Sequence, residues 1–198
     1  AIRMHAQVLL SARSTEEARE SAQDIMIGID KASRMITQLL TLARIEHNNQ
    51  QIDGKIDLVN IIQNTLALMD FQLVQAQIDL ELKLDSAPVI AQMDQLEIMF
   101  RNLLENAILY RTQERKPIIK ISCGCFEDYS FLQIEDNGIG LDEDQIPLIF
   151  QRFYRVNQNS LVIGSGLGLS IVKQIVDSYG GKIELRRADK TGGTVIRI

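Results

Sequence analysis

The first part of the chain places its apolar and small residues at the spacing typical of a helix that packs against another helix. They recur in alternating steps of four and three positions, at Ala18, Ala22, Ile25, Ile29, Ala32, Ile36, Leu39 and Ala43. A repeat of about 3.5 residues keeps one stripe of a helix turned toward a partner. We therefore predict a long helix that Ser14 can cap, with Glu16 and Glu17 favouring its positive end.

Residues 2–12 resemble the end of an earlier helix, so residues 1–46 are predicted to form a helical hairpin. Leu39, Leu40 and Leu42 leave more apolar surface than one hairpin can cover. A second hairpin would bury this surface and produce a dimeric four-helix bundle. A bundle with a purely structural role accounts for the stripe equally well.

The pattern changes after this helix. The polar stretch His47-Asn48-Asn49-Gln50-Gln51 and the following Gly54 break the helical spacing, so we assign residues 47–56 to a linker. Residues 57–198 then form a second domain, whose first helix can be capped by Asp57. Its further predicted elements are strands at 78–84, 89–91, 118–126, 131–134, 182–185 and 194–198, and helices at 95–110 and 167–178.

The order of these elements indicates the fold class. Helices separated by antiparallel strands predict an α+β protein with an α/β sandwich, in which helices cover one face of a mixed sheet. Cys123 and Cys125 share a strand face with Ile119 and Ile121, and no histidine or second cysteine pair lies nearby to form a zinc site. Both cysteines are predicted to be buried as small apolar side chains.

Composition and charge narrow the functional classes. The chain has 198 residues, of which 45% are hydrophobic and 24% charged, as in a globular protein with a core. Its net charge of −5 argues against a general nucleic-acid-binding protein. No apolar run is long enough to span a membrane, and the first residues lack the pattern of a signal peptide. Nine of the twelve glycines fall at or after Gly138, which suggests backbone brought close to a ligand such as phosphate.

Three short motifs carry candidate chemistry. In the first, Asn102 and Asn106 are four residues apart on a predicted helix, so both amides project from one face. Amide oxygens on a rigid helix suit Mg²⁺, which takes its other ligands from water and phosphates. Glu105 lies beside them around the helix and could accept a hydrogen bond from a metal-bound water. The alternative is that the two asparagines only bind neighbouring loops.

The second motif, Glu135-Asp136-Asn137-Gly138-Ile139-Gly140, directly follows a strand. At the mouth of a pocket, the Asp136 carboxylate can accept a hydrogen bond from an exocyclic amine such as adenine N6. The third motif, Gly164-Ser165-Gly166-Leu167-Gly168-Leu169-Ser170, runs into a helix, whose free backbone N–H groups and dipole would attract a negative ligand. An ordinary turn and a flexible hinge are the respective alternatives.

The segment Phe150-Gln151-Arg152-Phe153-Tyr154-Arg155 lies between these two motifs. We expect Phe150 and Phe153 to anchor the edge of a mobile loop (residues 154–163) to the core, with Arg152 and Arg155 facing phosphates. The alternative is an ordinary aromatic core with solvated arginines. The glycine motifs match neither a P-loop nor the Rossmann fingerprint.

Taken in this order, the four segments resemble the N, G1, F and G2 boxes of the sensor histidine kinases of bacterial two-component systems. That family belongs to the same ATP-binding superfamily as gyrase, Hsp90 and MutL. Residues 28–46 are similar to the second helix of the family's dimerisation and histidine-phosphotransfer domain, most of all in its QseC and PmrB type. Gly192-Gly193-Thr194 resembles the last glycine motif, whose threonine lies near the adenine.

The resemblance implies a nucleotide site. Asn102 and Asn106 would hold Mg²⁺ on the phosphates of ATP, with Glu105 as a third catalytic candidate. Asp136 would recognise adenine N6. The other candidates that the resemblance places on the adenine side are Tyr110, Gly138, Ile139, Gly140 and Thr194.

The phosphate side of the implied site depends on cations and on backbone N–H groups. The residues that the resemblance places there are Arg152 and Arg155, and the lid residues Gly164, Gly166, Leu167, Gly168 and Leu169. Leu109 stands where many relatives have a lysine. Arg111 is the candidate to supply that cation instead.

The phosphoacceptor motif of the family, His-Glu-Leu-basic-Ser/Thr-Pro, is absent, because neither His5 nor His47 has these neighbours. We therefore expect the cytoplasmic part of a longer inner-membrane sensor, which binds Mg-ATP and donates a phosphoryl group but cannot phosphorylate itself. The implied partners are a second copy, through the hairpin, and the receiver domain of a response regulator. No direct contact with nucleic acid is expected, and membrane contact only through segments before Ala1.

Two other functions remain open at this point. The first is an ATPase of the gyrase, Hsp90 and MutL type, which the heptad helix ahead of the domain disfavours. The second is a non-catalytic dimerisation or interaction module with a decayed nucleotide site. The presence of Asn106, Asp136 and the 164–168 glycine run argues against decay.

Overall fold

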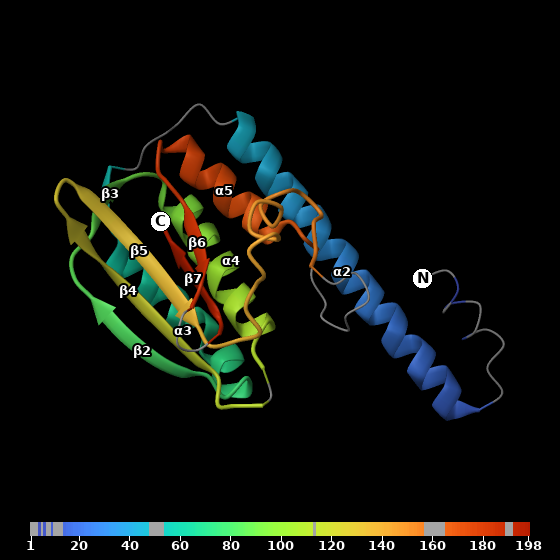
Figure 1. The fold of residues 1–198 in the computed structure, drawn as a ribbon. Coiled ribbons are helices and arrows are strands. Elements are labelled where there is room, and N and C mark those ends of the chain that lie inside the picture. Colours follow the sequence, from blue (N-terminus) through green and yellow to red (C-terminus); the bar gives the residue numbers. More distant parts are fainter. Residues whose placement is uncertain are drawn as a thin grey trace.

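The computed structural model describes residues 14–47, 54–112, 114–156, 165–188 and 192–198, together with Met4, Ala6 and Leu9. A long helix, α2 (Thr15–His47), lies against a compact α/β unit at one end and extends well beyond it at the other (Figure 1). It begins directly after Ser14, as the sequence predicts. The preceding arm of the expected hairpin falls almost wholly outside the described residues.

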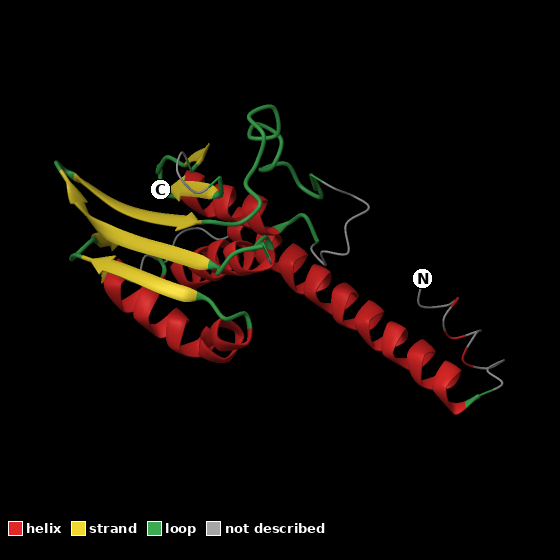
Figure 2. Ribbon diagram, turned by 60° about the horizontal axis from the view of Figure 1, so that its bottom comes forward, coloured by secondary structure: helices red, strands yellow, loops and turns green. Residues whose placement is uncertain are grey.

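The α/β unit is built around one mixed sheet. Its elements are β1 (Lys55–Asp57), α3 (Leu58–Gln75), β2 (Asp79–Leu84), β3 (Pro88–Ile90), α4 (Met93–Leu109), β4 (Ile118–Phe126), β5 (Tyr129–Asp136), α5 (Gly168–Ser178), β6 (Glu184–Arg187) and β7 (Thr194–Arg197). The sheet order is β2-β4-β5-β7-β6, with β2 parallel to β4 and the other pairs antiparallel, while β1 and β3 pair separately. The helices gather on one face of the sheet (Figure 2), which confirms the predicted α+β class.

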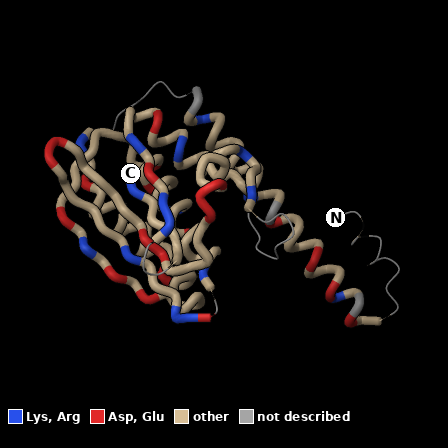
Figure 3. Tube along the Cα trace, viewed as in Figure 1, with Lys and Arg blue, Asp and Glu red and all other residues tan. Residues whose placement is uncertain are grey.

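The core lies between the sheet and helices α3, α4 and α5. Phe100 of α4 and Ile121 of β4 are among its fully buried side chains. Successive side chains of a strand point to opposite faces, so the outer face of the same strands is polar. There Lys120 Nζ lies 3.8 Å from Glu81 and 3.7 Å from Glu135, and charges of both signs alternate along the strands (Figure 3).

Helix α3 begins at the cap that the sequence predicts. The Asp57 carboxylate accepts hydrogen bonds from Ser86 Oγ at 2.6 Å and from the backbone N–H groups of Ala87 and Val59, each at 3.0 Å. These bonds, that of Ser86 first, hold the pKa of Asp57 below its ordinary value. Strand β1 starts at Lys55, within the stretch that the sequence assigns to the linker.

Helix α2 joins the core only near its C-terminal end. Leu42 and Ile45 are 2% and 8% exposed and belong to the core of the α/β unit, where α2 contacts α5. The seam residues Ile29, Ile36 and Leu39 are exposed in the part of the chain that the structure describes. The side of α2 that meets the α/β unit is therefore not the predicted seam. None of the described helices is long and apolar enough to cross a lipid bilayer.

The two cysteines of β4 differ in burial. Cys123 is buried as predicted, but Cys125 is exposed, so its prediction is wrong. Cys125 comes one residue before the end of β4, at the margin of the sheet. Its Sγ lies 3.4 Å from the Ser86 carbonyl oxygen and 3.7 Å from Ser130 Oγ. Alternation along a strand gives the face of a residue, but it does not say where the covering layer ends.

Candidate functional site

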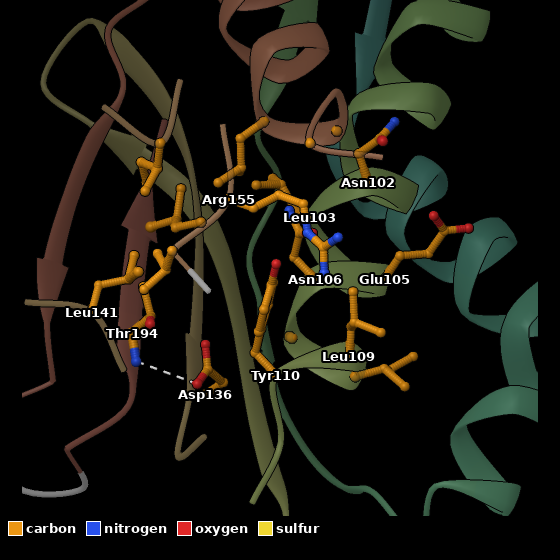
Figure 4. Close-up of a pocket in the computed structure, with 18 of the residues that line it drawn as sticks. Asn102, Leu103, Glu105, Asn106, Leu109, Tyr110, Asp136, Leu141, Arg155 and Thr194 are labelled. Carbon is orange, nitrogen blue, oxygen red and sulfur yellow. Dashed lines mark hydrogen bonds between the residues drawn. The ribbon is translucent and has the colours of Figure 1, made fainter. Parts of the chain in front are cut away.

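A cavity of about 560 Å³ opens beside α4 and is lined from several elements. One wall is the C-terminal half of α4, and the segment after β5, strand β7 and the start of α5 form the others. Figure 4 shows Asn106, Tyr110 and Asp136 around this space. Most of the site residues predicted from the sequence line this single cavity: Asn102, Glu105, Asn106, Tyr110, Arg111, Asp136, Ile139, Gly140, Arg155, Gly166, Gly168, Leu169 and Thr194.

The two asparagines lie against the first turn of α5. Asn102 Nδ2 donates to the Ile98 carbonyl oxygen at 2.8 Å. Its Oδ1 faces Gly168, where an added Cβ would lie 3.0 Å from Asn102 Oδ1 and 3.8 Å from Asn106 Nδ2. Asn106 Nδ2 is buried without a hydrogen-bond partner, an arrangement that is costly unless a ligand meets that amide.

This wall fits a metal ion that arrives with a ligand. The described residues contain no group of three or more His, Cys, Asp or Glu that could hold a metal alone. Mg²⁺ is commonly bound by one or two protein groups together with phosphates and water. The amides of Asn102 and Asn106 lie on one wall of the cavity, where their oxygens would be available to such a shared ion. The nearby N-terminus of α5 and the Asn106 Nδ2 donor favour the phosphates that would accompany it.

Glu105 lies on the same helix but on its exposed side. In Figure 4 its carboxylate points away from Asp136 and Thr194. Partial loss of hydration raises the pKa of the Glu105 carboxyl above its ordinary value, and the charges of Arg101 and Arg34 oppose this rise. Arg34 belongs to α2, so the long helix reaches this edge of the cavity.

Asp136 is held at the opposite side of the cavity by two backbone donors. Gly138 N donates to Asp136 Oδ1 at 2.8 Å, and Thr194 N donates to the same atom at 3.3 Å (Figure 4). Burial raises the pKa of Asp136 above its ordinary value, although these two hydrogen bonds lower it. The carboxylate therefore has a fixed orientation in a poorly hydrated place, as expected of a recognition group.

Glycine is required where the backbone segments around Asp136 meet. A side chain at Gly138 would overlap the Tyr110 carbonyl oxygen, and one at Gly193 would overlap the Asp136 carbonyl oxygen. Gly140 has φ +72°, and a Cβ there would overlap the carbonyl oxygen of Gly192. The loop after β5 is thus packed against α4 on one side and against the turn before β7 on the other.

The start of α5 is also tied to its surroundings. Leu167 is fully buried, and its N–H donates to Ser165 Oγ at 3.1 Å. Phe153 N donates to the Gly166 carbonyl oxygen at 2.9 Å, and a Cβ at Gly166 would lie 2.7 Å from the Phe153 carbonyl carbon. Leu167 supports the cavity from the core rather than lining it, as Gly138 does from the loop after β5. Gly164 lies outside the described residues.

The two arginines of the segment 150–155 differ in their position relative to the cavity. Arg155 lines the cavity, whereas Arg152 is exposed and does not line it. Phe153 is 53% exposed with φ +65°, Phe150 is half-buried, and the neighbouring Ile149 is 7% exposed. The expectation for Phe153 is wrong because it assumed helical spacing, while residues 143–153 form successive turns.

Three cavity-lining residues, Arg34, Met35 and Gln38, come from α2 and were not predicted. No motif in their sequence signals this role. Arg34 and Gln38 are four residues apart and therefore lie on one face of the helix, but nothing in the spacing says that this face meets α5. Their contribution depends on how α2 packs on the α/β unit.

Comparison with known proteins agrees with this geometry. A family model described as histidine kinase-, DNA gyrase B- and HSP90-like ATPase matches residues 91–198. The sensor histidine kinase YkoH of Bacillus subtilis is 36% identical over 189 residues, covering 93% of this chain and 40% of YkoH. The sensor protein QseC of Escherichia coli is 31% identical over 196 residues, covering 97% of this chain and 42% of QseC.

A solved structure gives the same relationship. The cytoplasmic segment of the histidine kinase QseC matches with a TM-score of 0.57 and 27% identity, covering 85% of this chain and 91% of that segment. The chain spans about 40% of the length of the curated relatives it matches. The chain belongs to the histidine kinase-, DNA gyrase B- and HSP90-like ATPase family, on its sensor histidine kinase branch.

Proposed function

We propose that this chain binds Mg-ATP and donates its γ-phosphoryl group to a histidine, for relay to an aspartate of a response regulator. The observation that carries the proposal is the paired arrangement across one cavity. Asp136, oriented by two backbone N–H groups, stands on one side, and Asn102 and Asn106 face the N-terminus of α5 on the other. A ligand with a hydrogen-bonding base at one end and a negative charge at the other satisfies both sides.

The two sides have separate tasks in this proposal. Asp136 accepts a hydrogen bond from the exocyclic amine of adenine, with Tyr110 and Thr194 beside the base. The N–H groups at the start of α5 and the Arg155 guanidinium bind the phosphates. Asn106 and Asn102 are the residues that would hold Mg²⁺, whose charge stabilises the transferring phosphoryl group.

The protein contributes mainly position in such a transfer. The rigid wall of α4 and the tightly packed glycine turns hold the nucleotide so that a histidine nitrogen can approach the γ-phosphorus in line with the leaving oxygen. Backbone dipoles at the start of α5 stabilise the negative charge that spreads during transfer. Glu105 is placed where it could accept a hydrogen bond from water at the edge of the cavity.

The acceptor histidine is proposed to lie on another segment. His5 is outside the described residues, and His47 is the last residue of α2 and lacks the neighbours of the acceptor motif. We further propose that the exposed seam of α2 pairs with a second copy and that a receiver domain is the downstream partner. We propose that the chain is the cytoplasmic portion of an inner-membrane sensor, and its likeness to the cytoplasmic segment of QseC supports this location.

Calorimetry of the purified chain with ATP tests the nucleotide site. We expect saturable ATP binding that requires Mg²⁺. Asp136→Asn should weaken it about tenfold, because a charged acceptor is replaced by a neutral amide. Glu135→Gln is the matched control, since Glu135 is the neighbouring residue on the outer face of β5 and pairs with Lys120. Absence of ATP binding by the unaltered chain would instead support an interaction module with a decayed site.

Transfer is tested with γ-labelled ATP and a separately supplied helical hairpin that contains the complete acceptor motif. We expect acid-labile label on the histidine of that hairpin and none on the chain itself. Release of phosphate without transfer would favour an ATPase of the gyrase and Hsp90 type. Label on His5 or His47 would contradict the proposed division between donor and acceptor.

A further inference from the structure

Helix α2 takes part in the cavity through a direct hydrogen bond to the start of α5. Ser165 Oγ donates to Gln38 Oε1 at 2.6 Å, and Ser165 Oγ in turn accepts a hydrogen bond from the N–H of Leu167 at 3.1 Å. One hydroxyl therefore joins α2 to the first turn of α5. These three residues are separated by up to 129 positions in sequence, so the contact exists only when α2 is packed on the α/β unit.

Packing fixes the position of this part of α2. Leu42 and Ile45, one and two turns after Gln38, are buried in the core shared with α5. Arg34 lies one turn before Gln38 on the same face of the helix and lines the cavity. The buried pair thus holds Gln38 and Arg34 at the edge of the cavity.

Arg34 stands at the phosphate end of the proposed nucleotide site. Gln38, its neighbour on α2, contacts Ser165 two residues before Leu167, and the α5 turn beginning there faces Asn102 and Asn106. Burial raises the pKa of Glu105, which comes between Asn102 and Asn106 in the sequence of α4, and the Arg34 charge lowers it. The adenine side, around Asp136 and Thr194, lies across the cavity (Figure 4).

Charge balance gives Arg34 a function at this place. Glu105 lines the same edge and would repel a polyphosphate. Arg111, another cation of the lining, donates to the Ile108 carbonyl oxygen at 2.8 Å. Arg34 is a cation with a long, exposed side chain, which can reach a phosphate while offsetting Glu105.

We propose that α2 completes the nucleotide site: Arg34 binds the terminal phosphate, and Gln38, acting through Ser165, positions the start of α5. This inference rests on the proposed function, because it needs a triphosphate in the cavity. It adds that the long helix and the nucleotide stabilise each other. A nucleotide that contacts Arg34 favours the packed position of α2, and by linkage a packed α2 strengthens nucleotide binding.

The test compares nucleotides that differ only in phosphate number. ATP, ADP and adenosine are titrated, with Mg²⁺ present, into the unaltered chain, Arg34→Gln and the matched control Arg44→Gln, which removes an exposed arginine of α2 outside the cavity. We expect Arg34→Gln to weaken ATP about fivefold, as for one charge-assisted contact at an accessible site, and to leave adenosine unchanged. The control should bind all three like the unaltered chain.

Two further variants separate direct contact from indirect effects. If Arg34 only neutralised Glu105, Arg34→Gln combined with Glu105→Gln would restore ATP affinity, and the proposed phosphate contact would be overturned. Gln38→Ala should weaken ATP and ADP alike, about threefold, because it removes one neutral hydrogen bond that holds the α5 turn. Equal ATP affinity of Arg34→Gln and the unaltered chain overturns the inference alone. Failure of the unaltered chain to bind ATP overturns the proposed function as well.

Discussion

Asp57 is the last residue of strand β1 and Asp136 is the last residue of strand β5, and the surroundings of the two carboxylates shift their pKa values in opposite directions. Asp57 is surrounded by three protein donors, Ser86 Oγ and the N–H groups of Ala87 and Val59, and its pKa is lowered. Asp136 is oriented by backbone N–H groups, but burial dominates and its pKa is raised. The first carboxylate belongs to the folding of the domain, and the second faces the cavity.

The difference shows how one fold separates stability from recognition. Hydrogen bonds that favour the charged form make ionised Asp57 a stabilising group in the folded state. At Asp136 the charged form is disfavoured, so its ionisation reduces the stability of the domain. Such a cost is common where a residue is retained for a ligand rather than for packing.

The largest expected effect tests whether the backbone around Asp136 is packed as rigidly as the backbone around Asp57. Gly193→Ala places a Cβ against the Asp136 carbonyl group, where only backbone could move. We expect a loss of about 3 kcal/mol in the free energy of unfolding and loss of ATP binding, because overpacking displaces both strands. Denaturant titration and calorimetry measure the two effects.

Gly180→Ala is the matched control for this change. Gly180 has open space around it, and unlike Gly193 it has a positive φ, +68°. Its substitution should therefore cost only the conformational term, about 1 kcal/mol, without loss of ATP binding. Equal effects of the two substitutions would mean that the pocket backbone is loosely packed.

The next prediction tests whether Asp57 contributes to the stability of the domain without contributing to ATP binding. Asp57→Ala removes the cap of α3 and leaves Ala87 N without its acceptor, so we expect a loss of about 2 kcal/mol in unfolding free energy. ATP affinity of the folded fraction should not change. Asp128→Ala, in the exposed turn between β4 and β5, is the control and should be nearly neutral.

The smallest expected effect is that of Asp136→Asn on the free energy of unfolding. The amide oxygen can still accept the Gly138 and Thr194 N–H groups, and the buried charge is gone. At neutral pH the variant should be at least as stable as the unaltered chain, within about 0.5 kcal/mol. A clear destabilisation would show that Asp136 is a structural group like Asp57.

The pH dependence of the two aspartates should have opposite signs. Stability contributed by Asp136 is full below the ordinary value of 3.8 and is lost as the pH rises through its raised pKa. The unfolding free energy of the unaltered chain should therefore rise relative to that of Asp136→Asn as the pH falls. Stability contributed by Asp57 is present above 3.8 and is lost as the pH falls through its lowered pKa, so its advantage over Asp57→Ala should shrink in acid. Unfolding curves at several pH values measure both trends.

Local patterns predicted the parts of the fold that local forces decide. The cap at Asp57, strand β4 at residues 118–126 and the boundaries of α4 to within two residues follow from side-chain chemistry and periodicity. The placement of most motif residues around one cavity was expected from the resemblance of the four segments to the kinase boxes, since the spacing of Asn102 and Asn106 gives only their shared helix face.

Contacts made between distant segments could not be predicted. The Ser165–Gln38 bond depends on the docking of α2, and the two-stranded β1–β3 ladder needs a partner 33 residues away from its middle residue, Ile56. Strand β5 begins at Tyr129 rather than at Phe131, because pairing with β4 extends it to the turn. Arg152 and Arg155 have equal chemistry, and only the path of the turns decides which reaches the cavity.

The position of β7 inside the sheet has a consequence for biosynthesis. Strand β6 pairs with β7 and not with β5, so it has no place in the sheet until the chain has returned through residues 194–197. Thr194, whose N–H orients Asp136, arrives with the same strand. During synthesis on the ribosome, the nascent domain therefore has no complete pocket until β7 has emerged, and it acquires the pocket and its finished sheet in one late step.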